Sequence, residues 1–123
     1  MKARNQTSAD RTRPFVDKRR HPRFKIGVEI SVHSRTCGLI RGHTVDLSES
    51  GISAMFKIEV PMGEMVRLEF TLPPGAVEVY AIVRQRNAFR YGFEFAEADP
   101  APGLEVVRRT CRDLALEESS FSG

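Results

Sequence analysis

Apolar and polar side chains alternate without interruption from Phe24 to Val32. Successive side chains of a β-strand point to opposite faces, so a period of two predicts a strand with one face in a hydrophobic core. Five further segments have strand-like patterns and are separated by turn residues, at 41–47, 51–56, 65–72, 77–86 and 90–96. The connections between them are too short for helical crossovers, which predicts antiparallel pairing.

A sheet of six short strands with one apolar face usually closes into a barrel, because closure removes the unpaired strand edges. We therefore expect an all-β fold with a six-stranded antiparallel barrel over about residues 24–96. The apolar side of each strand should supply the core, which predicts these buried residues: Phe24, Ile26, Val28, Ile30, Val32, Val45, Leu47, Ile52, Ala54, Phe56, Val66, Leu68, Phe70, Leu72, Val77, Val79, Ala81, Val83, Tyr91, Phe93 and Phe95.

After Pro102 the spacing of the apolar residues changes to that of a helix. This pattern predicts an amphipathic C-terminal α-helix over about residues 102–116, which packs on the side of the barrel or covers one mouth. Residues 117–123 are expected to form a frayed tail. The apolar stripe of the helix has spacings of 3, 4 and 3 and consists of Leu104, Val107, Cys111 and Leu114.

Basic residues are concentrated at the N-terminus, although the net charge of the whole chain is only +3. Residues 1–25 contain nine lysines and arginines against two aspartates, whereas the rest of the chain is mildly acidic. Residues 1–17 are too polar to bury much surface, which predicts a flexible basic arm. Such an arm indicates an anionic partner, and nucleic acid, a membrane surface or a nucleotide would each fit.

Several function classes are disfavoured by what the sequence lacks. No apolar run approaches the about 18–20 residues of a membrane span, and no secretory segment follows the start, so we expect a cytoplasmic protein without membrane insertion. Cys37 and Cys111 are expected to be reduced thiols. His21, His33 and His43 are widely spaced, so no metal site is predicted. No nucleophile motif is present, which argues against an enzyme.

Residues 18–23, with the sequence KRRHPR, form a basic cluster immediately before the first predicted strand. Pro22 favours an extended backbone, in which Arg19 and Arg23 would point the same way at a separation of up to about 13 Å. Two guanidinium groups at such a spacing suit a ligand with two separated anionic or acceptor groups. A basic tract with no specific ligand would look the same in isolation.

A second cluster, Asp46-Leu47-Ser48-Glu49-Ser50-Gly51, lies between the second and third predicted strands. Aspartate and serine start turns by bonding to nearby backbone, and we expect Gly51 to supply a positive φ angle. A carboxylate at this place could also accept two hydrogen bonds from the N1–H and N2–H₂ edge of guanine. Taken alone, this cluster is explained by the turn.

Together, Arg-x-x-x-Arg (Arg19, Arg23) and Asp-x-Ser-x-x-Gly (Asp46, Ser48, Gly51) resemble the two-part signature of PilZ domains over about residues 18–116. The resemblance implies a six-stranded antiparallel barrel with a C-terminal helix that binds cyclic di-GMP, a bacterial second messenger. It implies that the two arginines contact and stack on the phosphates and guanines. It also implies that Asp46 and Ser48 hydrogen-bond a guanine, and that Gly51 closes the turn.

Two neighbouring residues receive less definite roles from the resemblance. Lys18 occupies the position that in PilZ domains influences whether one ligand or an intercalated pair is bound. Arg20 should face away from Arg19 if the segment is extended, so its contact with the ligand is less certain.

The sequence therefore predicts a non-enzymatic receptor for cyclic di-GMP that needs no cofactor. It would relay the signal by ordering of the N-terminal arm to a downstream protein that controls motility, polysaccharide secretion or pili. One alternative is a PilZ-fold interaction module that works without ligand, against which the complete motifs count. Another is a small nucleic-acid-binding barrel, which needs an exposed aromatic platform. Tyr91, Phe93 and Phe95 fall instead on a core face.

Overall fold

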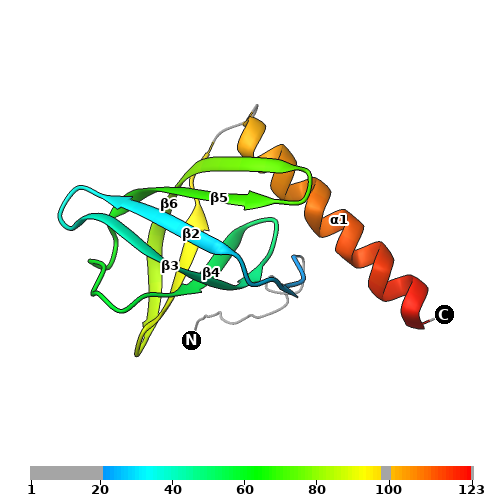
Figure 1. The fold of residues 1–123 in the computed structure, drawn as a ribbon, viewed down its shortest axis with the longest axis horizontal. Helices are drawn as coiled ribbons and strands as arrows, with labels where there is room; N and C mark the ends of the chain where they lie inside the picture. Colours follow the sequence, from blue (N-terminus) through cyan, green and yellow to red (C-terminus); the bar gives the residue numbers. More distant parts are fainter. Residues whose placement is uncertain (1–20, 98–100, 123) are drawn as a thin grey trace, which may run out of the picture.

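The computed structural model describes residues 21–97 and 101–122, and it is a closed antiparallel barrel followed by one helix (Figure 1). The predicted arm over residues 1–17 lies outside the described residues. The elements are β1 (Phe24–Lys25), β2 (Glu29–Ser34), β3 (Gly38–Leu47), β4 (Gly51–Met55), β5 (Met65–Leu72), β6 (Gly75–Asn87), β7 (Arg90–Phe95) and α1 (Pro102–Ser122).

Six strands close the barrel in the order β3-β2-β5-β6-β7-β4, because β4 also pairs with β3. Every pairing is antiparallel, as the short connections predicted. The two-residue strand β1 is an addition that pairs with the end of β3, where Phe24 lies opposite Leu47. The six-stranded antiparallel barrel with a C-terminal helix is thus confirmed.

The single strand predicted over residues 24–32 is interrupted between β1 and β2, and β2 continues to Ser34. The interruption lies beside an irregular part of β3. There the Ile26 N–H donates to the Val45 carbonyl at 3.2 Å, and the Val28 N–H donates to the Thr44 hydroxyl at 2.9 Å. Ile26 and Val28 are consequently only partly buried, although alternation predicted both in the core.

The barrel interior is filled by the apolar faces of the strands. Each alternating residue predicted to be buried on β5 and β6 is buried, and Val83 is 1% exposed. Phe95, also predicted in the core, is only partly buried. Val45 is another exception, since it is half-buried while its neighbour Thr44 is buried. The reason is a β-bulge in β3: Thr44 pairs with Ala54 and Asp46 with Ser53, which leaves Val45 as an extra residue.

Helix α1 packs against β6 and β5 through its apolar stripe, in which Leu104, Val107 and Cys111 are buried. The helix begins very close to β6, since a Cβ on Gly103 would lie 2.6 Å from Cγ1 of Val79. Its C-terminal turns extend beyond the strands (Figure 1). In the part of the chain that the structure describes, no helix has the length and apolarity needed to cross a membrane.

The predicted end of the helix near residue 116 was wrong, because α1 continues to Ser122. The residues predicted as a frayed tail are therefore helical up to that point. Glutamates 117 and 118 are good helix formers, and no proline or glycine interrupts the segment before residue 123.

Candidate functional site

A groove of about 730 Å³ lies beside the turn between β3 and β4. The segment before β1 contributes Arg23, and the turn region contributes Asp46, Ser48 and Gly51. The structure thus brings together four residues of the two predicted motifs. Lys18, Arg19 and Arg20 lie outside the described residues.

The bulge in β3 determines where Asp46 points. In an unbroken strand, Asp46 would share the inner face with Thr44, because side chains alternate with a period of two. The extra residue Val45 reverses the alternation, so that Leu47 enters the core with 0% exposure and Asp46 points outward to the groove. The Asp46 side chain is nevertheless only 15% exposed.

The Asp46 carboxylate is held by donors from two other strands. The Ser53 hydroxyl on β4 donates to Oδ1 at 2.8 Å, and Nη2 of Arg90 on β7 lies 2.8 Å from Oδ2. The same Arg90 nitrogen approaches the Ser53 hydroxyl at 3.4 Å. Each carboxylate oxygen therefore accepts one hydrogen bond from the protein itself.

Ser48 lines the groove, but its hydroxyl is engaged within the turn. It accepts from the N–H groups of Ser50 at 3.2 Å and Gly51 at 3.1 Å. The Ser48 N–H in turn donates to the Gly51 carbonyl at 2.9 Å. These bonds close the β3–β4 turn and fix the backbone that carries Asp46.

The expectation that Gly51 supplies a positive φ angle was wrong. In the described part of the chain, positive φ angles occur at Gly38, Gly63 and Ala88. Gly51 is required for another reason, since a Cβ there would lie 2.3 Å from the carbonyl oxygen of Phe93 on β7. The missing side chain allows β4 to pair closely with β7 at the edge of the groove.

The part of the groove wall formed by β6 and β7 contributes three arginines, Arg84, Arg86 and Arg90. A second bulge lies here, because Val83 pairs with Phe93 and Gln85 with Gly92, which leaves Arg84 unpaired in the ladder. The sequence interpretation missed these arginines. The segment from 84 to 90, RQRNAFR, carries three arginines around a predicted turn, and that density was the signal available.

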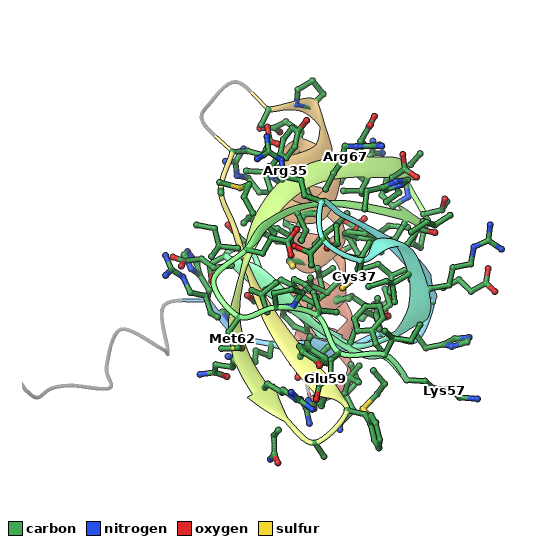
Figure 2. All side chains as sticks on the ribbon, turned by 90° about the vertical axis from the view of Figure 1, so that its left-hand side faces the viewer. Arg35, Cys37, Lys57, Glu59, Met62 and Arg67 are labelled. Carbon is green, nitrogen blue, oxygen red and sulfur yellow. The ribbon has the colours of Figure 1, made fainter. Side chains whose placement is uncertain are left out.

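Two of these arginines have acidic partners, one on β7 and one in the segment between β4 and β5. Nε of Arg84 lies 2.6 Å from Oε1 of Glu94. Nη2 of Arg86 lies 3.0 Å from Oε2 of Glu59, and its guanidinium lies 5.6 Å from the centre of the Tyr91 ring. Figure 2 shows the segment between β4 and β5 that carries Glu59 and Met62, and Met62 lines the groove.

The described lining contains four arginines against two carboxylates, Asp46 and Glu94. The positive excess favours an anionic ligand. The polar backbone and hydroxyl groups of the turn add hydrogen-bonding capacity on one side. The groove is therefore suited to a ligand that combines negative charge with hydrogen-bonding edges.

Aromatic residues beneath the groove belong to the core. Tyr91 and Phe93 are 1% and 3% exposed, and both rings pack edge-on against Phe56 with centroids 5.9 Å apart. The Tyr91 hydroxyl accepts from the Val60 N–H at 3.1 Å. These two residues offer no stacking platform, in agreement with the core face predicted for them.

On the outside of the barrel, Nε2 of His33 lies 2.9 Å from Oε1 of Glu69. This hydrogen bond, together with a contact from Arg67, lowers the pKa of Glu69 below its usual range.

Among the residues that the structure describes, no group of three histidines, cysteines or acidic residues could hold a metal ion.

The sequence and the fold were compared with those of known proteins. The family model of the PilZ domain matches residues 17–112 of the chain. No relative was found among curated proteins.

Three solved structures have a similar fold. The PilZ domain of CeSA from a cellulose-synthesizing bacterium has a TM-score of 0.63 and 16% identity, over 76% of this chain and 98% of that one. The inhibitor of motility (MotI/DgrA) of Bacillus subtilis has a TM-score of 0.66 and 19% identity, over 79% of this chain and 51% of that one. The PilZ domain of YcgR from Escherichia coli, solved with c-di-GMP, has a TM-score of 0.65 and 16% identity, over 85% of this chain and 97% of that one.

Proposed function

The chain belongs to the PilZ domain family, and from this premise we propose that it is a non-enzymatic receptor for cyclic di-GMP. The observation that carries the proposal is the groove, which is lined by Arg23 of one motif and by Asp46, Ser48 and Gly51 of the other. The c-di-GMP complex of the YcgR domain, which has the same fold, supports it.

The chemistry of the lining fits the two parts of this ligand. Cyclic di-GMP carries two phosphate charges, which the arginine-rich groove would attract, and two guanines with defined hydrogen-bonding edges. The Asp46 carboxylate can accept from guanine N1–H and N2–H₂. Arg23 can bind a phosphate or form two hydrogen bonds to guanine O6 and N7. Arg19 would act with Arg23, and Lys18 and Arg20 would supply further positive charge.

We further propose how binding is relayed. Arg23 lies at the groove and connects directly to the basic segment before it. A ligand held by residues 18–23 would draw residues 1–17 onto the barrel and form a new surface for a downstream protein. The downstream protein would control motility, polysaccharide secretion or pili. The receptor itself would act in the bacterial cytoplasm.

Isothermal titration calorimetry with cyclic di-GMP tests the receptor proposal. Removing one charged contact, in Arg23→Ala or Asp46→Ala, should weaken binding by about ten- to hundredfold, since such bonds contribute about 1.5–3 kcal/mol. Arg112→Ala and Asp113→Ala are matched controls, because both side chains are exposed on α1 away from the groove. They should bind like the wild type.

Absence of binding heat for the wild type would contradict the receptor proposal. Binding of a random single-stranded oligonucleotide with equal affinity and steep salt dependence would favour the nucleic-acid alternative instead. The relay is tested separately by amide hydrogen exchange in residues 1–20. Protection that is the same with and without saturating ligand would contradict the relay and leave the receptor proposal intact.

A further inference from the structure

We propose that Arg90 is a positioning residue of the site, which holds the Asp46 carboxylate in the orientation that reads a guanine edge. The proposal rests on the proposed function and concerns a residue outside both motifs. Arg90 begins β7, and Asp46 lies 44 residues earlier near the end of β3. Their ion pair, with Nη2 and Oδ2 2.8 Å apart, links β3 to β7 across β4, and both residues line the groove.

The direction of the Asp46 side chain is set by the backbone, but its rotamer is held by contacts with other strands. Asp46 follows directly on the bulge at Val45, where the regular ladder of β3 and β4 is interrupted. An aspartate side chain can change between staggered rotamers about χ1 and has a broad range about χ2. Contacts to Oδ1 from Ser53 and to Oδ2 from Arg90 come from two different strands, and together they restrict both torsions.

These contacts leave the carboxylate able to bind a ligand. An ionised carboxylate has about four acceptor positions on its two oxygens. Ser53 and Arg90 use one hydrogen bond on each oxygen, so one position on each oxygen stays available for the paired N–H donors of guanine. An acceptor that is already oriented loses less conformational entropy on binding than one that must be ordered.

Arg90 differs in this respect from the other arginines of the wall. Arg84 lines the same groove and carries the same charge, but its partner is Glu94 at 2.6 Å. Replacement of either arginine by alanine removes one positive charge from the groove. Only the replacement of Arg90 removes a contact to Asp46, so Arg84→Ala is a matched control for the electrostatic effect.

The experiment is a double-mutant cycle on cyclic di-GMP affinity, measured by calorimetry at one ionic strength. Arg90→Ala should weaken binding about tenfold more than Arg84→Ala does, as expected for the loss of support to a charged bidentate contact. In an Asp46→Ala background, Arg90→Ala and Arg84→Ala should weaken binding by factors that agree within about twofold. Without Asp46, Arg90 has no carboxylate to position, so each replacement removes only one positive charge, and independent effects are additive to about that degree. An equal loss on Arg90→Ala in both backgrounds would overturn the proposal and indicate direct contact with the ligand.

Ser53→Ala provides a second variant that changes no charge. It should also weaken binding in the wild-type background and have no effect in the Asp46→Ala background, and any other result would count against positioning. Folding of each variant is checked by its melting temperature without ligand, where Asp46 and Arg90 should also show a non-additive effect. Absence of wild-type binding overturns the receptor proposal itself, whereas wild-type binding without coupling overturns only the role of Arg90.

Discussion

Gly51 on β4 lies so close to Phe93 on β7 that a Cβ on Gly51 would be 2.3 Å from the Phe93 carbonyl oxygen. Both residues line the candidate site, and the two strands pair directly at this point through Ile52 and Phe93. The absence of a side chain at Gly51 therefore decides how closely the motif turn approaches the arginine-rich wall.

Gly51→Ala should destabilise the fold and widen this part of the groove. The new methyl group meets backbone rather than a flexible side chain, so β4 and β7 must separate, at a cost of about 1–3 kcal/mol. Chemical denaturation measures the change in the free energy of unfolding. Gly75→Ala is the control, since a Cβ there has nothing within 4 Å. A Gly51→Ala variant as stable as the control would disprove the close approach.

Tyr91→Phe should lower the free energy of unfolding by about 1–3 kcal/mol, because it leaves a buried donor without an acceptor. The Tyr91 hydroxyl accepts from the N–H of Val60, a residue that is 2% exposed. Urea denaturation gives the value. Tyr80→Phe removes a hydroxyl from a side chain that is half exposed, and it should change stability by less than about 0.5 kcal/mol. Equal effects of the two replacements would argue against the buried hydrogen bond.

Glu69 should make the stability of the protein depend on pH in the acid range. Its pKa in the folded protein is lowered, first by the hydrogen bond with His33 and second by that with Arg67. A lowered folded pKa stabilises the protein above the unfolded value of about 4.3, and this stabilisation is lost as the pH falls through the folded pKa. The difference in melting temperature between wild type and Glu69→Gln should therefore shrink from pH 7 towards pH 3.

Glu117→Gln is the control for this pH series, since Glu117 is an exposed carboxylate on α1. Its melting temperature should follow that of the wild type throughout. A difference between wild type and Glu69→Gln that stays constant on acidification would show that the carboxylate contacts do not stabilise the fold.

The two thiols should react at very different rates. Burial, and to a lesser degree the negative charge of Glu49, raises the pKa of Cys111 to about 11, and thiolate is the reactive form. Cys37 is exposed. At pH 8, a disulfide reagent such as Ellman's reagent should label Cys37 rapidly and Cys111 only after unfolding. Cys37→Ser should abolish the rapid phase, and a rapid phase that persists in this variant would contradict the burial of Cys111.

The sequence predicted the regular parts of the barrel well, because there each side chain's environment follows from local alternation. Val77, Val79, Ala81 and Val83 were expected on one face of a strand, and all four are buried. The prediction was wrong at Val45, where a bulge inserts one residue and brings Thr44 inward instead. A bulge depends on the partner strand, and alternation within one strand does not reveal it.

The candidate site also has a part that could be predicted from the sequence and a part that could not. The motif residues Asp46, Ser48 and Gly51 could be selected from their spacing, and they do lie together on the groove. The spacing did not reveal that the Ser48 hydroxyl is hydrogen-bonded within the turn. It also did not reveal that glycine is needed at position 51 because a side chain there would clash with the backbone of β7. Arg90 was missed altogether, since its relation to Asp46 exists only after β7 has paired with β4.

The sequence by itself determined the class of fold, the helix after it and the family, because hydrophobic period and motif spacing are properties of contiguous segments. Only the tertiary structure showed that Asp46 points outward because of the bulge at Val45, and what holds it there. Those features depend on the bulge in β3 and on the pairing of β4 with β3 and β7, which brings Ser53 and Arg90 to Asp46 in the closed barrel.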